Sequence, residues 1–154
     1  MPALIEVVTV IDAAPATVFD LELDVDVHAA SLAGSRETAS SRRRQLTLGD
    51  EVTFRARHFG LIWRMTSRIS AYERPSRFVD EQTRGPFRAM RHEHLFEARG
   101  DGSTRMTDRL TITAPFGPLG AVVTRYVLAP YLERLLRKRG DYVKRAAETG
   151  RRVR

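Results

Sequence analysis

Alternating apolar and polar residues in three consecutive segments between Phe78 and Asp108 constrain the fold of this chain most. In each segment, one face of the alternation carries large apolar residues, as a β-strand does when one of its faces is buried. The same faces also carry Asp, Gln or His, which is unusual for a purely apolar core. The pattern therefore predicts antiparallel strands that line a cavity able to hold a partly polar molecule.

The turn between the last two segments predicts which side chains lie opposite each other. The run Gly100-Asp101-Gly102 suits a three-residue hairpin loop with Gly102 in the left-handed conformation. A two-residue turn would instead mix the apolar and polar faces of the two strands. The three-residue loop sets Arg99 opposite Ser103, and the pairs that follow are Phe96–Met106, His94–Asp108 and His92–Leu110. We therefore expect His94 and Asp108 to be cross-strand neighbours that form a hydrogen bond if they are buried.

The first half of the chain predicts one more strand, two short helices and a hairpin. Residues 4–12 are rich in β-branched residues on both faces, which predicts a strand buried on both sides. Short helices are expected after Pro15, which suits a first helical turn, and over residues 25–32. Residues 35–48 predict a strand followed by a mobile loop, and 51–58 and 61–70 predict strands joined by a tight turn at residues 59–60.

A long helix is expected at the C-terminal end. From Leu119 to Leu136 apolar residues recur close to helical spacing, and residues 118–147 would span about 45 Å. Pro130 should kink or restart this helix. The predicted fold is therefore α+β: a curved antiparallel sheet of six or seven strands wrapped around the long helix, with two short helices after the first strand. We expect residues 1–154 to form a single domain, with 147–154 as a frayed basic tail.

Composition excludes several classes of function. The absence of cysteine excludes disulfides, Cys-ligated zinc, iron–sulfur clusters and thiol catalysis, and it fits a cytoplasmic protein. We expect neither a signal peptide nor a transmembrane segment, because no apolar run is long enough. The net charge is +7, and only Lys138 and Lys144 among the 26 basic residues are lysines. Arginine and acidic residues are interspersed from Glu51 to Arg109, which favours a solvated surface over a basic face for nucleic acid or anionic lipid.

Short motifs along nearly the whole chain resemble those of a known superfamily. They are Ala14-Pro15-x-x-Val18-Phe19, Phe59-Gly60-x-x-Trp63, Phe78-x-Asp80-x-Gln82-x-x-Gly85-Pro86-Phe87, His92-x-His94-x-Phe96, Gly102-x-Thr104-x-Met106-x-Asp108 and Pro115-x-Gly117-x-Leu119-Gly120. With the order of elements, they resemble the START-like helix-grip superfamily (SRPBCC), in its polyketide cyclase/dehydrase branch of small single-domain bacterial proteins. The resemblance implies a curved sheet that grips a long helix, with a hydrophobic tunnel between them.

The polar cluster on the inner strand faces has several interpretations. It could be a satisfied polar network that sets the sheet register, or an anchor in which His92, His94, Gln82 or Trp63 holds the polar end of an apolar ligand. It could also be catalytic, with His94 oriented by Asp108 as a general acid or base. Two histidines and a carboxylate also match some metal sites, but nothing sets the position of a third ligand, so we predict no metal and no cofactor.

The leading hypothesis is the binding of a small hydrophobic molecule of the lipid, polyketide or isoprenoid type, by a protein that is a monomer or a homodimer. The predicted ligand contacts are Phe54, Trp63, Met65, Phe78, Asp80, Gln82, Met90, His92, His94, Phe96, Met106, Leu110 and Tyr126. One alternative is an aromatase/cyclase-like enzyme, a cyclase or dehydratase-type lyase, that uses His94 and Asp108. A second alternative is an accessory protein that docks on an anionic surface through arginine; no specific nucleic-acid partner is expected.

Overall fold

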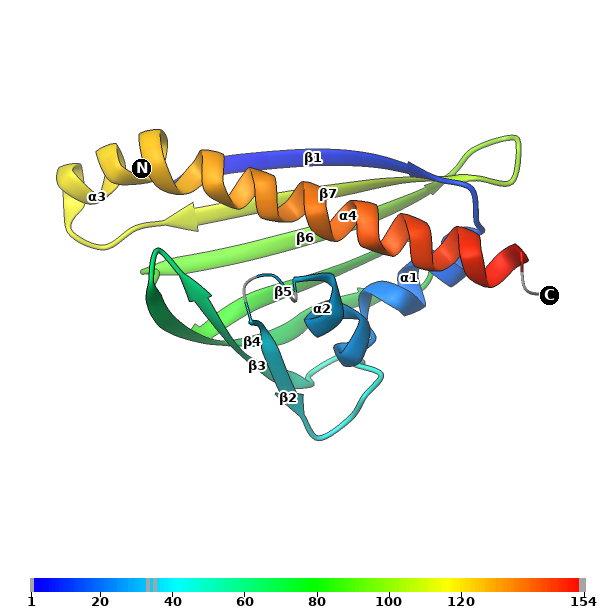
Figure 1. Ribbon diagram of the computed structural model, residues 1–154, viewed down its shortest axis with the longest axis horizontal. Helices are drawn as coiled ribbons and strands as arrows, with labels where there is room; N and C mark the ends of the chain where they lie inside the picture. The colour runs from blue at the N-terminus through cyan, green and yellow to red at the C-terminus, as the bar shows by residue number, and fades with distance from the viewer. Residues whose placement is uncertain (1, 33, 35, 153–154) are drawn as a thin grey trace.

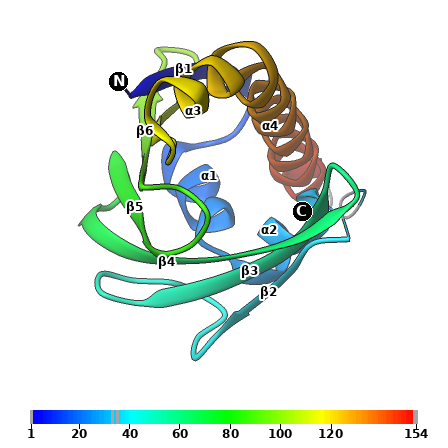
Figure 2. The same cartoon turned by 90° about the vertical axis from the view of Figure 1, so that its left-hand side faces the viewer.

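A seven-stranded antiparallel sheet curves around the interior of the protein (Figures 1 and 2). The computed structural model describes residues 2–32, 34 and 36–152. The strands are β1 (Ala3–Ile11), β2 (Thr38–Ser41), β3 (Glu51–His58), β4 (Leu61–Glu73), β5 (Arg77–Arg84), β6 (Ala89–Ala98) and β7 (Thr104–Thr113). Their order is β1-β7-β6-β5-β4-β3-β2. Strands β2 to β7 therefore form a meander, and the N-terminal strand joins the sheet beside β7.

Both hairpin registers predicted from the sequence are confirmed. His58 lies opposite Leu61 across a turn in which Phe59 and Gly60 both have positive φ, as a two-residue hairpin turn requires. Gly102 has a φ of 85°, and the Arg99 N–H donates to the Ser103 carbonyl at 2.8 Å. The pairs that follow are Phe96–Met106, His94–Asp108 and His92–Leu110.

The prediction that the first strand is buried on both faces was wrong. In β1, Ile5, Val7 and Ile11 are buried, whereas Leu4 is 65% exposed and Val8 and Val10 are also exposed. The outer face of this antiparallel sheet meets solvent, so the β-branched residues there reflect strand propensity and not burial.

The helices pack against the concave face of the sheet. Helices α1 (Pro15–Glu22) and α2 (Val25–Ser31) follow β1, and α3 (Gly117–Val123) follows β7. A π-helical turn over Thr124–Leu128 then leads into the long helix α4 (Ala129–Arg152). The Ala129 N–H donates to the Thr124 carbonyl, five residues earlier, immediately before Pro130. The predicted interruption at Pro130 is thus confirmed as a widened turn, because proline has no N–H to continue the α-helical ladder.

The predicted fraying from residue 147 was wrong within the described residues. Ala147 is buried, and α4 continues through it to Arg152. Lys144 forms an ion pair with Glu148 and also donates to the Val10 carbonyl at 2.9 Å, which ties this part of α4 to β1. Residues 153–154 lie outside the described residues.

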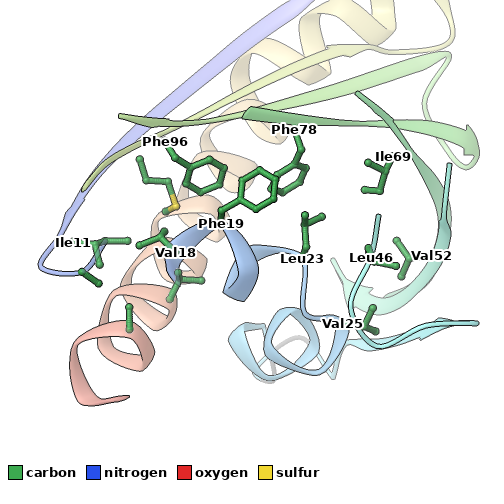
Figure 3. Packing of buried hydrophobic residues seen from close by; sticks show 14 residues of the cluster. Ile11, Val18, Phe19, Leu23, Val25, Leu46, Val52, Ile69, Phe78 and Phe96 are labelled. Carbon is green, nitrogen blue, oxygen red and sulfur yellow. The ribbon is translucent and has the colours of Figure 1, made fainter. Parts of the chain in front are cut away.

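One end of the interior is filled by aromatic side chains. Phe19 of α1 packs edge-on against Phe78 and Phe96, with ring centroids 5.5 and 5.3 Å away (Figure 3). Met106 and Val143 belong to the same buried cluster. A second cluster, which includes Val7, Ile112 and Leu136, joins α4 to β1 and β7. Because α1 plugs this end, any open space must lie toward the other end, near α3 and the β3–β4 hairpin.

Candidate ligand-binding cavity

A cavity of about 480 Å³ lies between the sheet and the helices. Its wall is mostly apolar and includes side chains from β3 to β7 and from all four helices. Eight of the predicted ligand contacts line it: Phe54, Trp63, Met65, Phe78, Asp80, Met90, His92 and Leu110. The cavity opens beside Phe59, Phe116 and Leu119, which line it and are also exposed to solvent. The predicted hollow beneath the C-terminal helix is therefore present.

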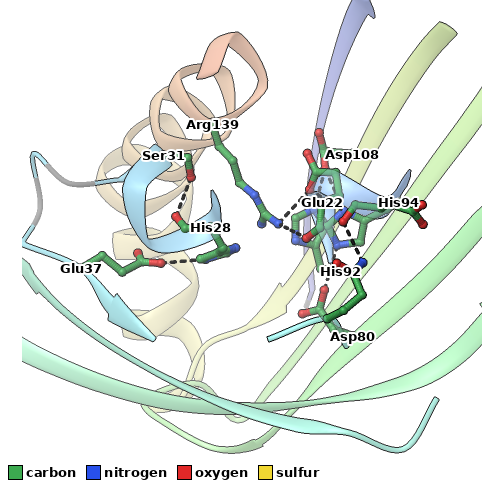
Figure 4. A network of polar contacts seen from close by, with 11 residues as sticks. Glu22, His28, Ser31, Glu37, Asp80, His92, His94, Asp108 and Arg139 are labelled. Atoms are coloured by element: carbon green, nitrogen blue, oxygen red, sulfur yellow. Dashed lines mark hydrogen bonds and ion pairs between the residues drawn. The ribbon is translucent and has the colours of Figure 1, made fainter. Parts of the chain in front are cut away.

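A buried charge network lies beside the deep end of the cavity (Figure 4). It consists of Glu22 at the end of α1, Asp80 on β5, His92 and His94 on β6, Asp108 on β7, and Arg139 on α4. Five separate elements thus supply charged or polar groups to one place. Such a network is costly to bury unless each charge has a partner close by.

His94 lies at the centre of this network. Its Nε2 lies 2.8 Å from Asp80 Oδ2, and its Nδ1 lies 3.2 Å from Asp108 Oδ1 and 3.7 Å from Glu22 Oε2. Nδ1 is not aligned for a hydrogen bond with either carboxylate, so the contact with Asp108 is an ion pair. Burial alone would lower the pKa of His94, but the Asp108 and Asp80 carboxylates outweigh burial and raise it to about 9. His94 is therefore an imidazolium at neutral pH.

His92 has the opposite protonation state. Its ring stacks on that of His94 with 3.7 Å between centroids, and its Nε2 hydrogen-bonds to Asp108 Oδ1 at 3.0 Å. Burial and the neighbouring charge on His94 lower the pKa of His92. A neutral His92 donates from Nε2 to Asp108, which leaves its Nδ1 as an acceptor. Burial would raise the pKa of Asp108, but its contacts with His92 and His94 lower it.

Glu22 and Arg139 form the second part of the network. Arg139 Nη2 lies 2.8 Å from Glu22 Oε2, and both side chains are almost fully buried. Burial would lower the pKa of Arg139, but the carboxylates of Glu22, Asp108, Asp80 and Glu37 together outweigh burial and raise it. Burial raises the pKa of Glu22 despite the opposing effect of Arg139. Arg139 lines the cavity, and its buried Nε has no hydrogen-bond partner among the described residues.

A further buried pair lies on the α2 side of the same cavity. His28 Nε2 is 2.7 Å from Glu37 Oε1, and the His28 ring packs on Phe54 with 4.3 Å between centroids. Burial and the Arg139 charge lower the pKa of His28. The structure places His28 in the cavity wall, where a neutral imidazole offers a polar contact.

Several predicted site residues do not line the cavity. His94 and Asp108 are fully buried behind His92, while Phe96 and Met106 belong to the aromatic core around Phe19. The Gln82 amide donates to the Phe87 carbonyl at 2.7 Å and so braces the β5–β6 turn. Tyr126 is 68% exposed on the outside of the π-helical turn. These six side chains are therefore not part of the cavity wall, because strand alternation identifies an inward face but not what fills the space above it.

The predicted ligand contacts left out several polar residues of the wall, among them Glu22, His28, Glu37 and Arg139. A signal existed for Arg139, because it continues the helical spacing of Leu132, Leu136 and Val143, which places it on the buried stripe of α4. Glu22 likewise follows Val18 and Phe19 at helical spacing on α1. A charged residue on an apolar stripe points to a buried ion pair, although the spacing does not reveal its partner.

Among the described residues, two groups of side chains have ligand atoms close enough for a cation. They are Asp80 with His92 and His94, and Glu22 with His94 and Asp108, with ligand atoms within 4.8 Å of one another in each group. Both include His94, which a metal could bind only after removing its proton. The raised pKa of His94 makes that step unfavourable, so the arrangement favours a proton over a metal ion.

A protein-family model described as polyketide cyclase/dehydrase and lipid transport matches residues 2–148. A comparison with curated protein sequences finds no match. No described helix has the length and apolar character needed to cross a bilayer.

Many solved structures share this fold. The Zhui aromatase/cyclase of Streptomyces sp. R1128 superposes with a TM-score of 0.81 at 19% identity, covering 100% of this chain and 97% of that one. A START superfamily protein from Mycobacterium smegmatis superposes with a TM-score of 0.73 at 10% identity, covering 95% and 97% of the two chains. A protein from Thermus thermophilus superposes with a TM-score of 0.76 at 19% identity, covering 94% of this chain and 99% of that one. At these identities the likeness extends to the fold alone.

Proposed function

This chain belongs to the polyketide cyclase/dehydrase and lipid transport family, and we propose that it is a single START-like ligand-binding domain for a small, largely apolar molecule. The observation that carries the proposal is the 480 Å³ cavity, whose apolar wall ends in a few buried polar groups. That volume and that mixture of side chains are typical of small-molecule sites. A lipid, a polyketide or an isoprenoid has the matching character: an apolar body with one polar end.

We place the polar end of the ligand at Arg139 and His92. Of the four anchors suggested by the sequence, Gln82 and Trp63 use their donors on backbone carbonyls, and His94 lies between carboxylates. His92 is the fourth, and it lines the cavity with an acceptor nitrogen available. Arg139 adds a donor, so a ligand carrying a hydroxyl beside a carbonyl or carboxylate would satisfy both groups.

Two fluorescent probes test this arrangement. N-phenyl-1-naphthylamine is apolar and neutral, and 8-anilinonaphthalene-1-sulfonate adds an anionic group. We expect both to bind the native protein, and the double variant Glu22→Gln/Arg139→Gln to keep the neutral probe while losing about tenfold in affinity for the anionic one. Removing both charges together avoids leaving one buried and unpaired.

The control is Glu133→Gln/Arg137→Gln, which removes an exposed ion pair of α4 with a separation of 3.0 Å. This control variant should bind both fluorescent probes with the affinity of the native protein. Native mass spectrometry of the purified protein should in addition detect a bound small molecule. The proposed binding function would be refuted if neither probe binds and the purified protein carries no small molecule.

Cyclase- or dehydratase-type catalysis is the second candidate, and one observation favours it. A neutral His92 faces the cavity with its other nitrogen on Asp108, as a general base requires. In this form of the hypothesis, His92 exchanges a proton with the substrate. His94 and Asp108, the pair predicted from the sequence, orient and polarise the His92 ring. With a synthetic poly-β-ketone thioester as substrate, His92→Gln should abolish product formation while N-phenyl-1-naphthylamine still binds. Equal turnover by this variant and the native protein would rule out catalysis by His92.

A further inference from the structure

Exposed apolar side chains gather around the mouth of the cavity. The β3–β4 hairpin contributes Phe59, Leu61 and Trp63, and the segment that includes α3 contributes Phe116, Leu119 and Val123. We call these six residues the apolar lip. All except Leu61 also line the cavity, and the two segments that carry these residues lie at the same end of the molecule (Figure 2). Apolar surface this concentrated marks an interaction site on a water-soluble fold.

Phe116 is the most exposed member of the lip. Its side chain is 83% exposed, and its backbone has a φ of 69° in the left-handed region immediately before α3. That conformation is uncommon for a bulky residue and costs free energy. Neither the exposure nor the conformation is compensated by burial within the chain. The observation therefore points to a partner outside it.

Five arginines lie on the segments that carry or adjoin the lip. Arg57 and Arg64 lie on the β3–β4 hairpin, Arg84 and Arg88 border the β5–β6 turn, and Arg125 follows α3. All five are exposed, and none forms an ion pair with any residue in the described part of the chain. We call them the arginine collar.

Acidic residues are missing from the segments that form this end. Residues 52–72, 82–92 and 110–132 contain no Asp or Glu, although the whole chain has 19. Arginine and acidic residues alternate along much of the sequence, but the fold brings these three segments together at the mouth (Figures 1 and 2). The overall charge of +7 is therefore distributed unevenly, because the segments that meet at the cavity entrance carry arginine and no acidic residue of their own.

We infer that the apolar lip and the arginine collar dock on the surface of an anionic lipid bilayer, with the cavity mouth against the membrane. Apolar side chains at loop and helix ends, with exposed cations on the same segments, match acyl chains lying beneath anionic headgroups. A second copy of the chain is disfavoured because docking mouth to mouth would bring two arginine collars together. A purely acidic protein surface would pair with the collar but would leave the lip without an apolar partner. The inference rests on the surface and stands independently of what the cavity holds.

Flotation of the protein with lipid vesicles tests the inference. We expect binding to vesicles of phosphatidylcholine and phosphatidylglycerol in a roughly two-to-one mixture, and little binding to phosphatidylcholine alone, because each collar arginine near an anionic surface strengthens binding roughly fivefold. Trp63, the single tryptophan of the chain, reports on insertion. Its fluorescence should be quenched by lipids brominated in their acyl chains.

Matched variants separate docking from general basicity. Phe116→Asp/Leu119→Asp should abolish flotation, and Arg84→Gln/Arg88→Gln should weaken it by more than tenfold. The controls are Leu48→Asp and Arg42→Gln/Arg43→Gln, exposed positions of the β2–β3 loop at a distance from the mouth. The controls should float like the native protein, and thermal melting should confirm that every variant folds.

Three outcomes would overturn the inference. The first is no flotation with anionic vesicles. The second is equal flotation of the lip variants and the native protein, which would reduce binding to adsorption of a basic surface. The third is a dimer, seen by analytical ultracentrifugation, that Phe116→Asp/Leu119→Asp dissociates while vesicles do not compete with it, which would assign the lip to a second copy.

Discussion

At the scale of single residues, the most unusual feature is an imidazolium held in the interior. Asp80 and Asp108 contact opposite nitrogens of the His94 ring, and Phe78 and His92 stack against it with centroids 4.0 and 3.7 Å away. The two imidazole rings are stacked so closely that a charge on His94 disfavours a second charge on His92. The network therefore keeps His94 charged and His92 neutral, and only the neutral ring lines the cavity.

His94 makes the folded protein less stable as the pH becomes alkaline. Its pKa is about 9 in the folded state, against 6.5 for an unperturbed histidine, so the folded state binds the proton more tightly than the unfolded chain does. Its contribution is fully present below pH 6.5 and is lost as the pH rises through 9. The shift corresponds to roughly 3 kcal/mol. Urea unfolding across this range should show the free energy of unfolding falling by an amount of that order.

The variant His94→Gln should remove most of this pH dependence, although it lowers stability overall. His58→Gln is the matched control, because burial lowers the pKa of His58 below the ordinary histidine value of 6.5 and its titration therefore lies outside this range. Nuclear magnetic resonance of the His94 ring should show a titration near pH 9. A free energy of unfolding that stays constant over this range would contradict a charged, buried His94.

At the scale of elements, the packing of α4 against β1 depends on one small residue. A Cβ added at Gly140 would lie 2.6 Å from Thr9 Oγ1, whereas one added at Gly150 on the same helix would meet no atom within 4 Å. Gly140 therefore permits a close approach, and Gly150 has no such role. The approach matters because α4 also carries Arg139 into the buried charge network.

Gly140→Ala should destabilise the protein by about 1 kcal/mol, because the clash outweighs the gain in helix propensity. Gly150→Ala should be neutral or stabilising by up to ~1 kcal/mol. The double variant Thr9→Ala/Gly140→Ala removes the clashing oxygen and should recover most of the loss, as measured by urea unfolding. If Gly140→Ala stabilises the protein as much as Gly150→Ala does, the helix and strand are not in tight contact at this position.

At the scale of the whole molecule, the position of α1 determines where space remains. Phe19 fills the interior space next to Phe78 and Phe96. The cavity occupies the rest of the interior up to α3 and the β3–β4 hairpin. The polar network lies near the boundary between filled and open space. One end of the cavity is therefore polar and closed, and the other is apolar and open.

Filling this space should block binding without harming the fold. Ala56 on β3 is buried and lines the cavity, so Ala56→Phe would place a ring in open volume. We expect it to weaken N-phenyl-1-naphthylamine binding about tenfold and to leave the melting temperature unchanged or raised. Ala98→Phe, at an exposed position of β6, is the control and should bind normally. If Ala56→Phe binds N-phenyl-1-naphthylamine as tightly as the native protein does, the probe does not bind in this cavity.

The amino-acid sequence by itself determined the strands, the hairpin turns and their registers, and the interruption at Pro130. These features follow from neighbours along the chain or across a tight turn, so alternation, turn chemistry and proline geometry specify them. The opposition of His94 and Asp108 was predictable for the same reason. The expected hollow had a different basis, namely the polar residues on the inner strand faces and the resemblance to the START-like superfamily.

Only the tertiary structure decided which of these residues face the cavity and what completes the site. Asp80 reaches His94 from the neighbouring strand, and Glu22 and Arg139 come from helices 117 residues apart in the sequence. Whether a side chain meets a core or a cavity depends on how far α1 and α4 extend over the sheet. That depends on three-dimensional packing among distant elements, which the period of a single strand does not encode.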